Sequence, residues 1–160
     1  MRKRLSILLI AALLVFTLCA CGSSEEVTSE SKLDVHQVAA DIVATGAFTD
    51  VTTENTNGQA LSVYGLSEDT VLDYSVYFSS MATPEEVAVF EVSSPEQASA
   101  VMDACTARRV SQVQSYETYA PDQIEKLNNA IIANVGNIVY YIVTKDSEAV
   151  NAVLKNYALA

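Results

Sequence analysis

Three cysteines and one histidine are the residues of this chain that could carry metal or nucleophilic chemistry. Cys19 and Cys21 are separated by a single residue, a spacing that could bind a soft metal ion. A thiolate site needs about four ligands, however, and only Cys105 and His36 remain to complete it. We therefore expect no metal site.

Covalent catalysis is also disfavoured by the pattern. Cys105 lies on the apolar stripe of a predicted helix, where a buried and inert thiol is the usual outcome. His36 is the only histidine that could act as its base, and we expect it to be solvated. The sequence has no Ser-x-x-Lys, His-Glu-x-x-His, glycine-rich phosphate loop or acidic calcium loop, so we expect no cofactor.

The charged residues are scattered along the chain. We expect the three acidic doublets on a solvated surface rather than in a metal site: Glu25-Glu26, Glu68-Asp69 and Glu85-Glu86. The basic doublet Arg108-Arg109 could hold an anionic partner, although ion pairs with neighbouring acids are the favoured interpretation.

The N-terminus has the layout of an export signal. Three basic residues at positions 2–4 precede an apolar run over residues 5–20, which is too short to span a bilayer comfortably. An ordinary signal peptidase prefers small residues at both flanking positions, and Leu18 occupies the first of them. Ordinary cleavage is therefore disfavoured.

The segment Leu18-Cys19-Ala20-Cys21, followed by Gly22, resembles the lipobox of bacterial lipoproteins. The resemblance implies that residues 1–20 are a signal peptide and that Cys21 receives a diacylglycerol and becomes the mature N-terminus. Acyl chains such as palmitate, at roughly 0.8 kcal/mol per buried CH₂, would hold the protein on the extracytoplasmic face of the cell membrane. An uncleaved N-terminal anchor is the alternative.

Residues 21–33 are polar and rich in Ser and Glu, so we expect a disordered tether. The mature chain keeps six basic against 20 acidic side chains, a balance of −14 with the histidine neutral. This charge disfavours nucleic acid and anionic lipid heads as partners of the body. We expect the partners to be the bilayer, through Cys21, and an envelope protein or ligand.

Residues 34–160 carry the periodic segments of a single domain. Capped apolar stripes predict helices within residues 34–46, 93–119 and 146–157, and a short helical piece begins at Pro121. Alternation and β-prone runs predict two hairpins, with strands in residues 72–80, 87–92, 130–135 and 138–144. The turn Gly136-Asn137 joins the second pair.

This order of helices and hairpins predicts an α+β fold, with a mostly antiparallel four-stranded sheet and helices packed on one face. The segments FEVSSPEQASAVM and YIVTKDSEAVNAV have a similar strand, cap and helix. This similarity suggests an internal ββα repeat.

Two segments add a resemblance to a known family: Tyr119-Ala120-Pro121-Asp122-Gln123, and the hairpin from Asn128 to Val143. Over roughly residues 34–157, the chain resembles small bacterial lipoproteins that are classified only as a domain of unknown function. Ile124 stands where that family usually has a tyrosine. The resemblance implies location and fold, and it implies no activity.

Eight tyrosines and no tryptophan make a skewed aromatic set. Because strand side chains alternate, Tyr140 and Tyr141 must face opposite sides of the sheet, and we expect one of them to lie outside the helix-covered core. We predict that the exposed tyrosine belongs to a recognition surface. The residues of this predicted surface are Tyr116, Tyr119, Pro121, Asp122, Gln123 and Tyr141. The alternative is that these rings only cover sheet edges.

Two functions remain open. The lack of a catalytic constellation favours a non-catalytic binding or assembly lipoprotein. The alternative is a hydrolase that acts on envelope material through two carboxylates, for which the sequence offers Asp and Glu but no recognisable pair.

Overall fold

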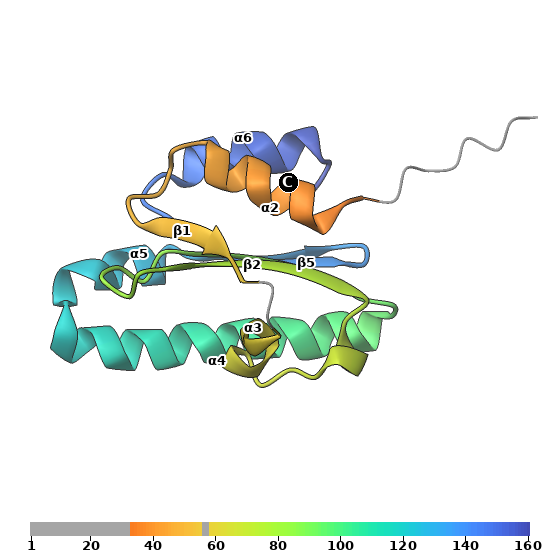
Figure 1. The fold of residues 1–160 in the computed structure, drawn as a ribbon, viewed down its shortest axis with the longest axis horizontal. Helices are drawn as coiled ribbons and strands as arrows, with labels where there is room; N and C mark the ends of the chain where they lie inside the picture. Colours follow the sequence, from red (N-terminus) through yellow and green to blue (C-terminus); the bar gives the residue numbers. More distant parts are fainter. Residues whose placement is uncertain (1–32, 56–57) are drawn as a thin grey trace, which may run out of the picture. The chain divides into compact units, whose positions relative to one another are not determined.

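The central element is an antiparallel sheet of five strands in the order β1-β2-β3-β5-β4, and Figure 1 shows this sheet edge-on between helices. The computed structural model describes residues 33–55 and 58–160, so the predicted signal peptide, Cys21 and most of the tether lie outside the described residues. The strands are β1 (Val51–Glu54), β2 (Asp73–Ser79), β3 (Glu86–Glu91), β4 (Ile131–Val135) and β5 (Ile138–Val143).

Four of these strands are the predicted ones, and the predicted turn joins β4 to β5, with Gly136 at a φ of 58°. The edge strand β1 is the addition. Residues 52–59 are rich in turn formers, yet Thr53 and Glu54 pair with β2. The expectation of a four-stranded sheet is therefore wrong by one edge strand.

Three of the five α-helices that the structure describes begin after a residue whose side chain caps the first turn. The five helices are α2 (Val35–Ala44), α3 (Gln59–Val63), α4 (Pro95–Tyr119), α5 (Ile124–Asn128) and α6 (Ser147–Asn156), with short 3₁₀ turns η1 (Glu68–Thr70) and η2 (Pro121–Gln123). The side chains of Asp34, Ser94 and Asp146 accept hydrogen bonds from backbone N–H groups of the first turns of α2, α4 and α6, as predicted. Within the described residues, no helix has the length and apolar character that crossing a membrane requires.

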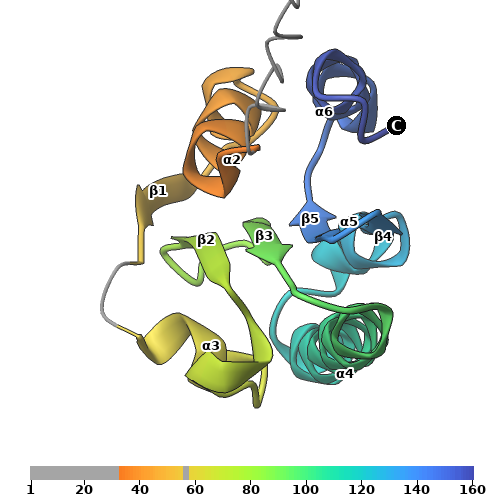
Figure 2. The ribbon, with the colours of Figure 1, turned by 90° about the vertical axis from the view of Figure 1, so that its right-hand side faces the viewer.

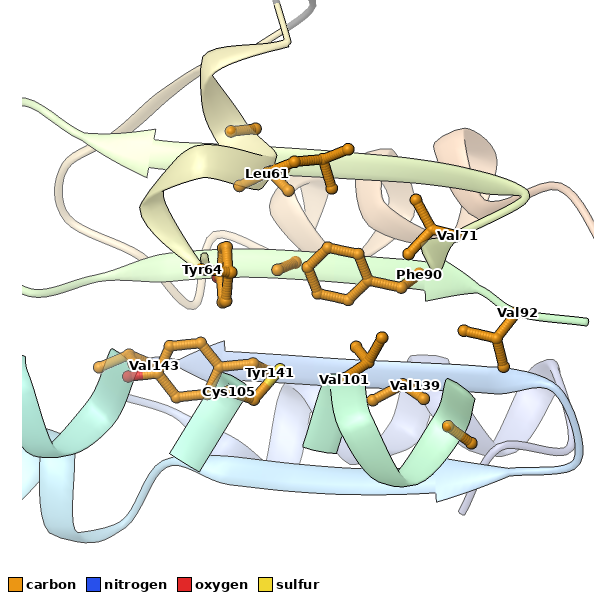
Figure 3. Packing of buried hydrophobic residues seen from close by; sticks show 14 of the residues in the cluster. Leu61, Tyr64, Val71, Phe90, Val92, Val101, Cys105, Val139, Tyr141 and Val143 are labelled. Atoms are coloured by element: carbon orange, nitrogen blue, oxygen red, sulfur yellow. The ribbon is translucent and has the colours of Figure 1, made fainter. Parts of the chain in front are cut away.

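Helices cover both faces of the sheet, and the expectation of one covered face is wrong (Figure 2). α2 and α6 pack on one face, around Val87, Val89 and Ile142. α3 and α4 pack on the other face, around Phe90 and Tyr141 (Figure 3). The reason is that β3 between its two terminal glutamates and the whole of β5 are continuous apolar and aromatic runs, so both of their faces need a cover.

The helical layer on the second face also changes the interpretation of Tyr140 and Tyr141. Tyr140 is 3 % exposed and its hydroxyl donates to the backbone carbonyl of Leu159 at 2.6 Å. Tyr141 is fully buried on the opposite face, and its hydroxyl donates to Gln112. The expected outward tyrosine of the hairpin does not exist, because each face of β5 has its own helical layer.

The two ββα units do not repeat each other in packing. α4 follows the β2–β3 hairpin on one face, whereas α6 follows the β4–β5 hairpin on the opposite face. The similar strand and cap patterns therefore reflect local rules for starting a helix after a strand.

Candidate functional site

A groove opens between α3, the connection from β2 to β3, and the second half of α4. It is bordered by Gln59 and Val63, by residues 78–83, and by one face of α4 from Arg108 to Tyr119. We call it the α3–α4 groove. Its volume of about 930 Å³ is at the upper end of the range of ligand pockets.

Exposed apolar side chains gather at the rim of this groove. Val63 is 41 % exposed, Tyr119 is 70 % exposed and Met81 is 79 % exposed. They are three of the six large hydrophobic side chains that are exposed in the described part of the chain. Scattered exposed apolar residues are normal, but their concentration around one hollow makes the groove a candidate interaction site.

The rim is held together by Tyr116. Its hydroxyl donates to the backbone carbonyl of Met81 at 3.2 Å, which ties α4 to the β2–β3 connection. Its ring meets the ring of Tyr119 edge to face, with centroids 5.9 Å apart. Met81 itself has a φ of 74°, a conformation that non-glycine residues rarely adopt, so the connection presents its side chain in a fixed and unusual backbone setting.

The floor of the groove holds a buried ion pair. Glu86, at the start of β3, is 1 % exposed. It accepts from Arg108 Nη2 at 2.8 Å and from Gln112 Nε2 at 2.9 Å, and the Tyr64 hydroxyl donates to its other oxygen. The Arg108 guanidinium also lies 5.9 Å from the centre of the Phe78 ring. Carboxylate and guanidinium therefore neutralise each other.

This pair sets the chemistry of the groups around it. Burial opposes the charge of Arg108, but Glu86 outweighs that effect and raises the pKa of the guanidinium. Burial and the charge of Glu86 together raise the pKa of the Cys105 thiol to about 12. Cys105 is fully buried, as predicted, and a thiol with this pKa stays protonated and unreactive at neutral pH.

Glu85 is buried as well, on the other side of the strand from Glu86. It accepts from the backbone N–H groups of Thr49 and Asp50, from the Thr49 hydroxyl, and from Lys126 Nζ at 2.8 Å. Burial alone would raise the pKa of Glu85, but these donors outweigh it and lower the pKa below its ordinary value. The expectation that this doublet lies on a solvated surface is wrong.

His36 does not face Cys105. It is 48 % exposed in its side chain and bridges two carboxylates, with Nδ1 at 2.5 Å from Glu54 and Nε2 at 3.2 Å from Asp73. The Ser75 hydroxyl also donates to Glu54, at 2.6 Å. The hydrogen bond to Glu54, opposed by burial, raises the pKa of the imidazole. The two ring nitrogens therefore contact carboxylates, and neither contacts Cys105.

The structure brings together two of the six residues predicted for binding. Tyr116 and Tyr119 line the α3–α4 groove. Pro121 and Asp122 are exposed in η2, just beyond the end of α4, and Gln123 donates to Asp122 at 2.6 Å. The sixth residue, Tyr141, is buried and reaches the groove only through Gln112.

Met81, Glu86 and Arg108 are groove residues that the sequence reasoning did not select for binding. The doublet Arg108-Arg109 was expected to form ion pairs with acids, and Arg108 does so with Glu86. Within the described residues, no group of three or more His, Cys, Asp or Glu side chains could hold a metal ion.

Over residues 47–144, the chain matches the family model described as Domain of unknown function (DUF4358), and it belongs to that family. The match supports the expected resemblance to a domain of unknown function, over a shorter range than expected. No curated protein and no solved structure matches the chain.

Proposed function

We propose that this member of the DUF4358 family is a membrane-anchored extracytoplasmic lipoprotein whose folded part is a non-catalytic binding or assembly module. The α3–α4 groove is its binding face. The observation that carries this proposal is the cluster of exposed apolar side chains at the groove rim, at Val63, Met81 and Tyr119. Exposing such a rim to water is unfavourable, and a partner that covers the rim removes this unfavourable contact.

The composition of the groove favours binding over hydrolysis. A glycosidase-type mechanism needs two carboxylates that face each other across the scissile bond. Among the described residues that line the groove, Glu86 is the one carboxylate, and Arg108 neutralises it. The groove therefore offers apolar contact and neutral hydrogen-bonding groups, which suit recognition.

The membrane anchor rests on the lipobox-like segment around Cys21. Replacing Cys21 with Ala should abolish acyl labelling and leave an uncleaved precursor. Cys19→Ala is the matched control, because Cys19 lies two residues before Cys21 and would leave with the signal peptide. Labelling that survives Cys21→Ala would contradict the anchor while leaving the binding groove untouched.

The binding face is tested by affinity capture of the full chain from its own membrane. Tyr119→Ala should weaken capture of the partner by roughly 1–3 kcal/mol, the usual loss for an aromatic anchor. Leu72→Ala is the control, because Leu72 is 60 % exposed and does not line the groove. Equal capture by both variants would show that another surface binds.

A further inference from the structure

The apolar rim extends beyond the hollow of the α3–α4 groove. Met81 and Tyr119 are more than two-thirds exposed, although both border the groove. A small molecule that fills the groove would leave much of these side chains in water. A chain segment that crosses the groove would cover the rim and place one side chain into the hollow, which is the usual arrangement of a peptide anchor in a groove.

A carboxylate lies at one end of this rim. Asp50 accepts a hydrogen bond from the Ser80 hydroxyl, and Ser80 lines the groove. The next residue after Ser80 is Met81, whose backbone carbonyl accepts from the Tyr116 hydroxyl, so Asp50 lies at the end of the groove that Tyr116 closes. Within the described residues, Asp50 has no ion pair with any basic side chain.

The groove floor and the body of the domain set the preferred charge of an occupant. Arg108 is the one cation among the described residues of the lining, and it is already bound to Glu86, so these residues offer an anionic ligand no free positive charge. Residues 33–160 carry five basic and 17 acidic side chains, a balance of −12. This field repels anions and attracts cations over the distance of a Debye length.

From these features we infer that the occupant of the α3–α4 groove is a protein segment with an apolar anchor side chain beside a Lys or Arg. The anchor enters the hollow between Val63, Met81 and Tyr119, and the basic side chain pairs with Asp50. The inference rests on the proposed function and adds the chemistry of the partner.

Other classes of occupant fit less well. Anionic lipid head groups and acidic polymers are repelled by the body and find only a neutralised arginine in the groove. A sugar chain would use the neutral hydroxyl and amide groups of the lining, but it would leave the aliphatic rim at Val63 and Met81 uncovered. An uncharged apolar peptide would leave Asp50 without a partner.

The probe is a library of random peptides displayed on phage and selected against the full chain in detergent. Enriched sequences are synthesised, and their affinities are measured for the natural protein and four variants. Tyr119→Ala removes the aromatic rim and Asp50→Asn removes the charge while keeping an acceptor for Ser80. Leu72→Ala and Asp103→Asn are the matched controls, because both residues are exposed outside the groove.

We expect the enriched peptides to share an apolar residue with a Lys or Arg close to it. Tyr119→Ala should weaken binding about tenfold, and Asp50→Asn about two- to fivefold at low salt. The effect of Asp50→Asn should shrink in high salt, since an exposed ion pair is screened. The two control variants should bind like the natural protein.

The outcomes separate this inference from the proposed function. Enriched peptides that depend on Tyr119 but lack basic residues, or that ignore Asp50→Asn, would leave the groove as the binding face and overturn the inferred partner. Peptides that bind Tyr119→Ala as well as the natural protein, or a selection without enrichment, would contradict both. Circular dichroism melts of each variant ensure that a loss of binding is not a loss of folding.

Discussion

Glu85 and Glu86 are neighbours in the sequence, and each is 1 % exposed, but different kinds of group hold them. Glu85 is held by the backbone N–H groups of Thr49 and Asp50, by the Thr49 hydroxyl and by Lys126. Glu86 is held by side chains alone, and Arg108 is its one cation among the described residues. The comparison shows that the charge of Glu85 is stabilised by a loop and a lysine. The charge of Glu86 is stabilised mainly by α4, the helix that also forms the groove.

The largest effect is expected at Arg108. Arg108→Met leaves Glu86 buried without its counter-charge and should lower the free energy of unfolding by about 3–5 kcal/mol. Urea unfolding followed by circular dichroism measures it.

Adding Glu86→Gln to the Arg108→Met chain should recover most of the loss. The amide is uncharged and its oxygen still accepts from Tyr64, so no buried charge remains. A double variant as unstable as Arg108→Met alone would show that packing of the arginine stem, and not charge, stabilises this floor.

A smaller effect is expected at Lys126. Lys126→Met should cost about 1–2 kcal/mol, because Glu85 keeps the donors of Thr49 and Asp50 and the lysine is itself partly exposed. Lys145→Met, at an exposed lysine, is the matched control for the loss of one positive charge. If Lys126→Met were as costly as Arg108→Met, the contrast between the two carboxylates would fail.

The contrast also explains how far the sequence could predict the molecule. Helix starts at Asp34, Ser94 and Asp146 and the Gly136-Asn137 turn were predictable, because capping and turn formation depend on residues close in the sequence. The number of helical layers was not predictable, because the alternation of side chains along a strand shows which of them share a face and does not show what covers that face. The continuous apolar runs of β3 and β5 were the signal that both faces are buried.

Some residues of the α3–α4 groove were likewise predictable from the sequence, and others were not. Tyr116 and Tyr119 could be selected as an aromatic pair on one helix, three residues apart. The pair of Glu86 and Arg108 could not, because its members are 22 residues apart and an acidic doublet usually lies in water. Likewise, no local pattern predicts that Asp50 contacts Ser80 at the groove, since that contact depends on how the β2–β3 connection folds back.

A third acidic site, half exposed around His36, sharpens the comparison through pH. The groups that face the imidazole are Glu54, Asp73 and, through Glu54, Ser75. Since the pKa of His36 is raised in the folded protein, its contribution to stability is fully present below the ordinary value of 6.5 and is lost as the pH rises through the folded pKa.

The expected loss from this cluster stays below about 1 kcal/mol, because water screens a half-exposed ion pair. Thermal melts between pH 5 and about 9 should show it, and His36→Asn should flatten that part of the profile. Glu85 affects stability at acidic pH, opposite to the range of His36. Its pKa is lowered, so its contribution is present above its ordinary value of 4.5 and is lost as the pH falls through the folded pKa. A profile that is unchanged by His36→Asn would remove His36 from this account.

The smallest effect on stability is expected at Tyr119, on the same face of α4 as Arg108. Its ring is 70 % exposed and contacts Tyr116 at its edge, so Tyr119→Ala should change the free energy of unfolding by no more than about 0.5 kcal/mol. α4 would then carry two residues with different roles. Loss of Arg108 would lower stability, whereas loss of Tyr119 would weaken only the binding of a partner. Urea unfolding and partner binding, measured on the same preparations of Tyr119→Ala and Arg108→Met, separate the two roles. If Tyr119→Ala lowers stability in step with binding, the ring is part of the packing that holds α4 to the sheet, and the rim of the groove is structural.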